Sequence, residues 1–482
     1  MTEQLEQVDY RKYSPIILSI VFSAFMVNLD TYIVNVSLPT ISRYFDITMS
    51  NVSLVVISYL LALTSTTLIF GKMVDTFGVK NMFVAGYLVF SAGSLLCGIS
   101  WTIWILVLSR FLQGIGGAMI VISGYTSITK HLPADRRGWA FGCVSSAAAV
   151  GIAVGTPLGG IITGYLSWHW IFLLNVPVGI IASILCVRTL PASDRSTESG
   201  RHFDFKGAAL SFFGILSLVY ALNFGKECGW TSVPIVTAFL LAFAITVLFI
   251  VQEKRSANPL LNLGIFKNTS FLFAIVGTMA ALIIMAGNNF MLPFYLEMSR
   301  GLKPQQAGLV LMIYSIVYMI AGPRAGRASD RIRPSLLCAA AMLSASCACL
   351  SFVFTLSVQS LYPVIVFLFW YAISNSLFMP SNNNLVMSMA EENHQGEASG
   401  VFNVFSKLAL VLGVCLFEAL FSEMIPRHSG DLADAGIPAG LLNHGFQAVY
   451  LCAAAICLLG LIFTILTARE KGLSAAGEVG RP

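Results

Sequence analysis

Three charged side chains lie deep inside long apolar stretches of this 482-residue chain: Asp30, Arg110 and Lys407. A charged side chain in an apolar stretch long enough to cross a membrane is costly, and it usually faces a protein interior and has a role. A carboxylate near a guanidinium takes up and releases a proton if its exposure to water changes, because the cation favours ionisation and desolvation opposes it. Asp30 and Arg110 therefore indicate proton chemistry.

Depth along the expected helices supports pairing of these two residues. At about 1.5 Å per residue, Asp30 lies about 12 Å and Arg110 about 10 Å below the same surface. The alternative is a permanent Asp30–Arg110 pair that only fixes helix packing. Lys407 lies about 16 Å deep, near the bilayer midplane, where it either faces a cavity and disfavours dications or extends away and has no effect. Glu418, near the end of its apolar stretch, is expected at the surface and is the next candidate for a proton carrier.

The composition shows what surrounds these residues. Hydrophobic residues make up 57% of the chain and charged residues 11%, whereas soluble proteins carry about 25% charged residues. The mean hydropathy is +0.81. These values exclude a soluble enzyme, a nucleic-acid module and a disordered scaffold. The formal net charge of +5 is too small to indicate a nucleic-acid binder.

Fourteen apolar stretches are long enough to be helices that span a hydrocarbon core of about 30 Å. We predict an all-α integral membrane protein with fourteen transmembrane helices, arranged as two six-helix parallel-repeat bundles plus an inserted helix pair. The predicted spans are 15–38, 51–71, 80–100, 103–128, 138–163, 169–188, 205–222, 232–252, 270–297, 304–324, 334–355, 360–386, 396–421 and 445–468.

The distribution of Lys and Arg predicts the orientation of these spans. With the amino terminus inside, most of the 28 basic residues lie on the cytoplasmic side, as the positive-inside rule requires. Both termini are therefore expected in the cytoplasm, and the protein is expected in the cell membrane, as a multi-pass protein of a bacterial inner membrane. The ten Cys residues fall almost entirely inside apolar stretches and are interpreted as small core residues.

Three short patterns occur twice at a nearly constant offset, which predicts two related halves. Asn35–Pro39 matches Asn289–Pro293, Gly71 with Asp75 matches Gly326 with Asp330, and Gly138–Gly142 matches Gly396–Gly400. An even number of spans between copies gives the parallel repeat of one transporter class. The predicted domains are a bundle at 1–190, a cytoplasmic linker at 191–204, an inserted pair at 205–255, a second bundle at 270–470 and a cytoplasmic tail at 471–482.

Four local motifs carry a resemblance to a known family. They are LDTYIVNVSLP from Leu29, GKMVDTFGVK from Gly71, LSRFLQGIGGAM from Leu108 and GIAVGTPLGG from Gly151. With these motifs the chain resembles the fourteen-span drug:proton antiporter family of the major facilitator superfamily. It departs from the family at Thr76, where Arg is common, and at Ser406–Lys407, where relatives often carry Arg–Gln.

The resemblance implies roles for the residues in these motifs. Asp30 and Arg110 would couple transport to protons. Gly151, Gly155 and Gly159 lie on one helix face beside Pro157, and they would contact a helix of the second half and close one side of the membrane; generic tight packing is the alternative. Asp75 and Asp330 would cap neighbouring helices or pair with Lys80 and Arg331, unless they are solvated loop charges. The gating set is Gly71, Asp75, Gly78, Lys80, Gly151, Gly155, Pro157, Gly159, Gly326, Asp330 and Arg331.

Isolated amides and aromatic rings predict a substrate cavity for a mostly apolar ligand. Trp370–Tyr371 aligns through the repeat with Leu112–Gln113, which supports a place on the cavity wall, although lipid-facing or core aromatics are an alternative. The predicted cavity residues are Asn35, Gln113, Asn288, Asn289, Trp370, Tyr371, Asn375 and Lys407.

The sequence thus favours a proton-coupled antiporter that exports small amphipathic molecules or drugs by alternating access. An exporter of an endogenous metabolite, anion or lipid is the first alternative, and a membrane ligand sensor that does not transport is the second. An enzyme is not expected, because no nucleophile, base and orienting group share an interior depth. The expected partners are protons, a small amphipathic substrate and lipid, with no nucleic acid, cofactor or metal, and the protein is expected to be monomeric.

Overall fold

The computed structural model describes residues 10–191, 205–256, 264, 268–329, 331–389, 395–424 and 439–479. Within these ranges, fourteen helices are long and apolar enough to cross a membrane. The prediction of an all-α protein with fourteen spans is confirmed, and the helices extend beyond several of the predicted spans. The first runs from Tyr10 to Phe45, whereas 15–38 was expected.

The first half of the chain forms seven helices that make six spans. They are α1 (Tyr10–Phe45), α2 (Met49–Phe77), α3 (Val79–Gly98), α4 (Ile103–His131), α5 (Ala134–Tyr165), α6 (His169–Leu173) and α7 (Asn175–Thr189). The α6 and α7 helices form one span that is interrupted at Leu174. Thr48 and Thr102 are the N-cap residues of α2 and α4, and their side chains each accept a hydrogen bond from a backbone N–H of the first turn.

The remaining helices form an inserted pair and a second half. The pair is α8 (Phe205–Cys228) and α9 (Val233–Arg255). The second half is α10 (Thr269–Phe294), the π-helical turn η2 (Tyr295–Ser299), α11 (Pro304–Ser329), α12 (Pro334–Thr355), α13 (Tyr362–Met387), α14 (Gln395–Met424) and α15 (Ala439–Val479). The predicted domain boundaries at 190, 204, 255 and 270 stay predictions.

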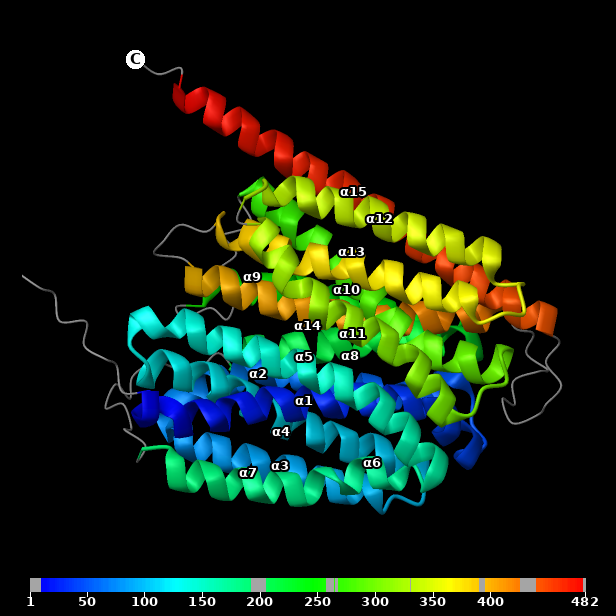
Figure 1. The fold of residues 1–482 in the computed structure, drawn as a ribbon, viewed down its shortest axis with the longest axis horizontal. Coiled ribbons are helices and arrows are strands. Elements are labelled where there is room, and N and C mark those ends of the chain that lie inside the picture. Colours follow the sequence, from blue (N-terminus) through cyan, green and yellow to red (C-terminus); the bar gives the residue numbers. More distant parts are fainter. Residues whose placement is uncertain are drawn as a thin grey trace, which may run out of the picture.

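The helices run roughly parallel to one another, and the two halves lie side by side, with α1 to α7 in the lower part of Figure 1 and α10 to α15 in the upper part. The beginning of α1 and the last turns of α15 lie at the same end, on the left of Figure 1, and we call this the termini end. The connection between α1 and α2 lies at the other end, which we call the far end. Within the halves, α1 packs on α5, α3 on α4, α12 on α15 and α10 on α14.

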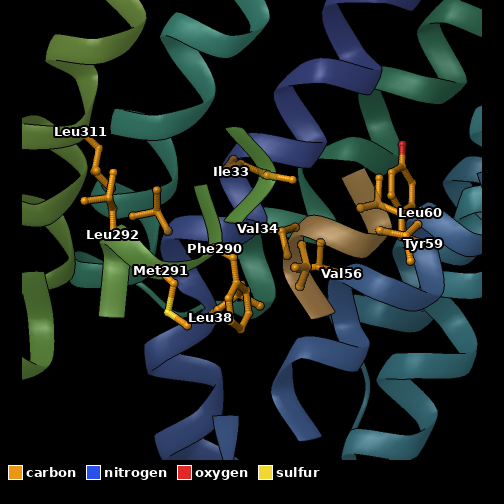
Figure 2. Close-up of a cluster of buried hydrophobic side chains, with 14 of the residues drawn as sticks. Ile33, Val34, Leu38, Val56, Tyr59, Leu60, Phe290, Met291, Leu292 and Leu311 are labelled. Carbon is orange, nitrogen blue, oxygen red and sulfur yellow. The ribbon is translucent and has the colours of Figure 1, made fainter. Parts of the chain in front are cut away.

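The two halves meet along a continuous apolar core. Ile33 and Leu38 of α1, Val56 of α2 and Phe290 of α10 belong to one buried cluster, and Figure 2 shows these side chains lying between the helices of both halves. The inserted pair packs through α8, which contacts α2 of the first half and α14 of the second. The pair therefore straddles the line where the halves meet, which we call the seam.

The glycine stripe of α5 does not make the contact that was expected of it. Cβ atoms built at Gly151, Gly155 and Gly159 would lie 2.5, 2.9 and 2.5 Å from carbonyl oxygens of α1, a helix of the same half. The expectation that these glycines touch the second half is wrong, because their face of α5 is turned toward α1. A neighbouring residue makes that contact, since a Cβ at Gly160 would lie 2.5 Å from the Pro304 carbonyl oxygen of α11.

Candidate functional site: a buried ion pair beside a central cavity

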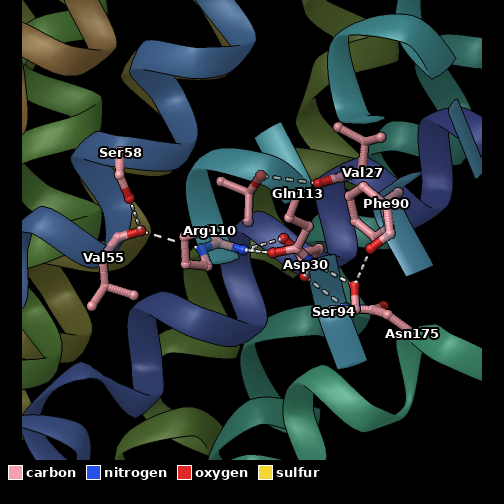
Figure 3. Close-up of polar contacts among 10 residues, drawn as sticks. Val27, Asp30, Val55, Ser58, Phe90, Ser94, Arg110, Gln113 and Asn175 are labelled. Carbon is pink, nitrogen blue, oxygen red and sulfur yellow. Dashed lines mark hydrogen bonds and ion pairs between the residues drawn. The ribbon is translucent and has the colours of Figure 1, made fainter. Parts of the chain in front are cut away.

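Asp30 and Arg110 form an ion pair in the interior of the first half. Arg110 Nη1 lies 2.7 Å from Asp30 Oδ2, and both residues are almost completely buried. The side chain of Gln113 donates to Asp30 Oδ1 at 2.9 Å, and Asn175 Nδ2 donates to the same oxygen at 2.6 Å. The carboxylate of α1 is thus surrounded by donors from α4 and α7 (Figure 3). Three donors, one of them charged, stabilise its ionised form.

The partners of Asp30 are themselves held in place. Arg110 Nε donates to the carbonyl oxygen of Val55 at 3.2 Å, and Gln113 Nε2 also donates to Ser94 Oγ at 2.7 Å. The guanidinium lies 4.2 Å from the ring centroid of Tyr59, a cation–π contact. These bonds anchor Arg110 and Gln113 of α4 to α2 and α3. A proton on Asp30 would therefore disturb several helices of the half at once.

A cavity of about 390 Å³ lies between the halves. It is lined in the middle of the bundle by the buried residues Tyr32, Asn35 and Tyr314, and nearer the termini end by the exposed residues Tyr125 and Asn403. At the far end, α5 and α11 are in close contact at Gly160. The cavity is therefore closed toward the far end and open toward the termini end.

The chemistry of the cavity wall is that of phenols, amides and apolar side chains. Lys407 is the one charged residue among the described residues that line it, and Asp30 is not among the lining residues. No carboxylate of the described residues forms an ion pair with Lys407. Tyr59 does line the cavity, and its ring also contacts Arg110, so this residue adjoins both the ion pair and the cavity.

A small recess of about 30 Å³ continues the cavity toward the far end. Its walls include Asn35, Asn288 and Tyr371. Both amide atoms of Asn288 and the Oδ1 atom of Asn35 are buried and have no hydrogen-bond partner among the described residues. Buried polar groups are normally paired, so these amides are suited to bind a polar group of a ligand or an ordered water.

The structure separates the predicted cavity residues into two groups. Asn35, Asn289 and Lys407 line the large cavity, and Asn288 and Tyr371 line the recess. Gln113, Trp370 and Asn375 do not line either space. Gln113 binds Asp30, Trp370 donates to Ser344 at 2.9 Å on the outer side of the half, and Asn375 donates to the hydroxyl of Tyr314 at 2.7 Å. The repeat alignment that placed Trp370 on the wall was therefore wrong.

The gating residues are placed as follows. Gly78 joins α2 to α3 with a φ of 83°, a conformation that favours glycine. Lys80 does not pair with a carboxylate in the described residues, since its Nζ donates to the Leu190 carbonyl oxygen at 3.0 Å. Cβ atoms at Gly71 and Gly326 would meet no atom within 4 Å. Asp330 and the side chain of Asp75 lie outside what the structure describes, Arg331 is exposed, and Pro157 lies inside α5.

Several residues that matter to the site were missed by the sequence analysis. Asn175 and Tyr59 adjoin the ion pair, and the signal for Asn175 is an isolated amide in an otherwise apolar stretch. Glu418 was expected at the surface, but it is completely buried. Glu297, at the end of a predicted span, is also buried and pairs with Arg43 of the first half.

Comparison with known proteins supports a transporter. The model of the Major Facilitator Superfamily matches residues 20–414. The chain is 28% identical over 459 residues to the riboflavin transporter RibZ of Clostridioides difficile, which covers 95% of this chain and 98% of the relative. It is 29% identical to the putative multidrug resistance protein MdtD of Klebsiella pneumoniae, over 92% of this chain and 93% of the relative.

Solved structures show the same fold at low identity. A bacterial homolog of the human lysosomal transporter Spinster aligns with a TM-score of 0.69 at 14% identity, covering 95% of this chain and 98% of that one. The peptide transporter POT in complex with sulfate aligns with a TM-score of 0.69 at 15% identity and covers 94% of both chains.

The fourteen spans, the central cavity between two halves and these similarities define a multi-pass membrane transporter and not an enzyme. The chain belongs to the Major Facilitator Superfamily. Its relatives support a place in the drug:proton antiporter type of family within it.

Proposed function

We propose that the protein is a proton-coupled antiporter that exports small amphipathic molecules by alternating access. The observation that carries this proposal is the fully buried Asp30–Arg110 pair, which contacts the cavity-lining residue Tyr59 beside a cavity that is open at one end only. One proton entering across about 100 mV and one pH unit supplies about 2.3 plus about 1.4 kcal/mol. That is enough to concentrate an uncharged substrate by a few hundredfold, about tenfold for each 1.4 kcal/mol.

The substrate class is part of the same proposal. Phenols, amides and apolar side chains suit an aromatic or otherwise amphipathic ligand, and Lys407 favours an uncharged, zwitterionic or anionic one over a dication. An endogenous metabolite is the second candidate. Asn35 Oδ1 and both amide atoms of Asn288 favour it, because they have no partner among the described residues and match a ligand with a hydrogen-bonding ring edge. The name of the relative RibZ indicates a riboflavin transporter.

The test is efflux in energised inside-out vesicles, with and without a protonophore, for a matched set of uncharged, monoanionic and dicationic aromatic compounds. We expect uptake of the uncharged or monoanionic compounds that the protonophore abolishes. Uptake that is driven by another ion or by ATP would contradict the proton coupling. A ligand that binds to the purified protein but is never moved would instead favour the sensor.

We further propose that the termini end faces the cytoplasm of a bacterial cell and that the far end faces outward. Cys228, at the end of α8, is exposed. In a variant that keeps Cys228 as its one cysteine, an impermeant thiol reagent added to intact cells should label it. A cysteine at Ser196, in the predicted linker, should be labelled only after the cells are opened. The reverse pattern would overturn both the orientation and the inserted-pair arrangement.

A further inference from the structure

Two buried carboxylates lie at the far end of the bundle, each in contact with the opposite half. Glu297 of η2 forms an ion pair with Arg43 of α1. Glu418 of α14 accepts a hydrogen bond from Ser50 Oγ of α2 at 2.5 Å. Both contacts join the first half to the second where the cavity is closed, so both must break if the halves separate at this end.

The two carboxylates differ in how they are compensated. Glu297 has a guanidinium partner. Glu418 is completely buried, it accepts a hydrogen bond from the neutral hydroxyl of Ser50, and its Oε2 atom has no hydrogen-bond partner among the described residues. A buried ionised carboxylate without a cation is strongly disfavoured, whereas the neutral acid needs no counter-charge. In this closed arrangement the geometry around Glu418 fits a protonated carboxyl group.

The charged groups around Glu418 do not change this conclusion. Lys226 and Glu227, neighbours on α8, act on it with opposite signs. On its own helix, Cys415 and Ser422 lie nearby. From α2 it meets the hydroxyl of Ser50, and no charged group of α10 or α15 in the described part of the chain acts on it. The effect of the Glu227 anion is larger than that of the Lys226 cation, so these two charges do not hold Glu418 ionised.

The inserted pair holds the partner of Glu418 in place. Asn223 of α8 donates to the Ser50 carbonyl oxygen at 3.0 Å and accepts from Ser53 Oγ at 2.8 Å. We call Ser50, Ser53, Asn223 and Glu418 the seam cluster. Near it, the short connection after α8 contacts the second half, since Trp230 Nε1 donates to Glu423 of α14 at 3.2 Å. The inserted pair therefore bonds to the first half through Asn223 of α8 and to the second half through Trp230 of the connection between α8 and α9.

We propose that Glu418 is a proton-binding site of the far-end gate, distinct from the Asp30 pair, and that the inserted pair positions Ser50 to close on its protonated form. When the far end opens, Ser50 moves away and water reaches Glu418, which gives its proton to the solution on that side. When the far end closes, a proton returns from the same solution. The site therefore sets the proton concentration at which the gate closes and does not itself carry protons across the membrane.

The direction of the pH effect follows from linkage. The closed state binds a proton at Glu418 and the open state does not, so a fall in pH on the far side favours the closed state. For one proton, the ratio of closed to open molecules changes by up to about tenfold per pH unit.

The test is a distance measurement across the far end in the full-length protein. Tyr44 of α1 and Tyr362 of α13 are exposed there, at 57% and 77% of their surface, and cysteines at these two sites in a background without the native cysteines can carry spin labels. In lipid nanodiscs, we expect the short-distance population to grow as the pH falls from about 8 to about 5. The Glu418→Gln variant keeps an acceptor for Ser50 but cannot ionise, and it should show the short distance at every pH.

The matched control is Glu423→Gln, which changes an exposed carboxylate one to two turns further along the same helix and should keep the wild-type pH dependence. Asn223→Ala leaves Glu418 in place but frees Ser50, so the short-distance population should decrease and its midpoint should move to lower pH. A wild-type distance that does not change with pH overturns the proposal. So does a Glu418→Gln protein that titrates like the wild type or stays open, and an Asn223→Ala protein with an unchanged midpoint overturns the role of α8.

Discussion

Asp30 and Glu418 are both completely buried carboxyl groups in the membrane-spanning part of the chain, but their surroundings are opposite. Asp30 receives hydrogen bonds from Arg110, Gln113 and Asn175, all within its own half. Glu418 receives one from Ser50, which belongs to the other half. The first site is therefore built to keep a charge, and the second is built to respond to the separation of the halves.

This difference determines what each site has to do in a transport cycle. To protonate Asp30, bonds inside the first half must rearrange, because rigid movement of the halves leaves its three donors in place. To expose Glu418, the halves need only separate as rigid bodies. In the cycle proposed above, Asp30 would respond to the cavity and Glu418 to the closure of the far-end gate.

The largest effect is expected for Asp30→Asn. The amide keeps the volume of the side chain, but it removes the group that binds the proton and leaves the buried Arg110 without a counter-charge. Loss of one partner of a buried pair costs about 3–5 kcal/mol, so thermal stability should fall measurably. Accumulation of substrate against a gradient should be lost completely, as measured in energised vesicles, while counterflow or ligand binding persists.

Asn28→Ala is a suitable control for Asp30→Asn. Asn28 lies on the same helix and lines the cavity, but its Nδ2 atom donates to the Ala24 carbonyl oxygen of its own helix at 2.8 Å. Gradient-driven transport should persist in this variant. If Asp30→Asn still concentrates its substrate and remains sensitive to a protonophore, another group carries the proton and the permanent-pair interpretation of Asp30 is correct.

An intermediate effect is expected from glycines on the two faces of α5. A Cβ at Gly160 would lie 2.5 Å from the Pro304 carbonyl oxygen across the halves, whereas one at Gly155 would lie 2.9 Å from the Leu29 carbonyl oxygen within the first half. The clash created by Gly160→Ala can therefore be relieved if the halves separate. We expect a shift to longer distances between spin labels at positions 44 and 362.

The clash created by Gly155→Ala cannot be relieved by separating the halves, because α1 and α5 belong to the same half. It should lower thermal stability by about 1–3 kcal/mol, the usual cost of overpacking, with little change in the distance distribution. If both variants change the distances equally, α1 and α5 do not move as one body.

Much of the fold could be predicted from the sequence, because a span of about 20 apolar residues is itself a physical requirement of the bilayer. The Asp30–Arg110 pair was also predictable, because opposite charges at equal depth inside a membrane-spanning bundle usually pair with each other. The sequence did not predict which neighbouring helix each helix face contacts. Gly151, Gly155 and Gly159 define a close contact by their spacing, but the spacing does not say which neighbour, and only the packing shows that it is α1.

The burial of Glu418 could not be predicted from the sequence for a related reason. Its position near the end of an apolar stretch suggested the surface, because a single sequence carries no information about the inserted pair that covers this end of α14. Similarly, Trp370 lies next to Tyr371 in the chain, but on a helix adjacent residues point about 100° apart. Tyr371 lines the recess while Trp370 binds Ser344.

The smallest effect is expected for Lys407→Gln, which extends the comparison to a third interior charge. Asp30 has a full set of partners and Glu418 has one, but Lys407 lies on the cavity wall with no ion-pair partner among the described residues. Two unit charges about 4 Å apart interact by about 1 kcal/mol in water and about 4 kcal/mol at the effective dielectric of a protein surface. The ammonium group should therefore favour a bound monoanion and oppose a dication.

With a matched pair of aromatic compounds, Lys407→Gln should lower the ratio of monoanion to dication transport by about tenfold, the ratio that corresponds to about 1.4 kcal/mol. Transport of an uncharged analogue serves as the internal reference and should change little. A wild type that prefers the dication, with the same preference in the variant, would mean that Lys407 does not act on the substrate.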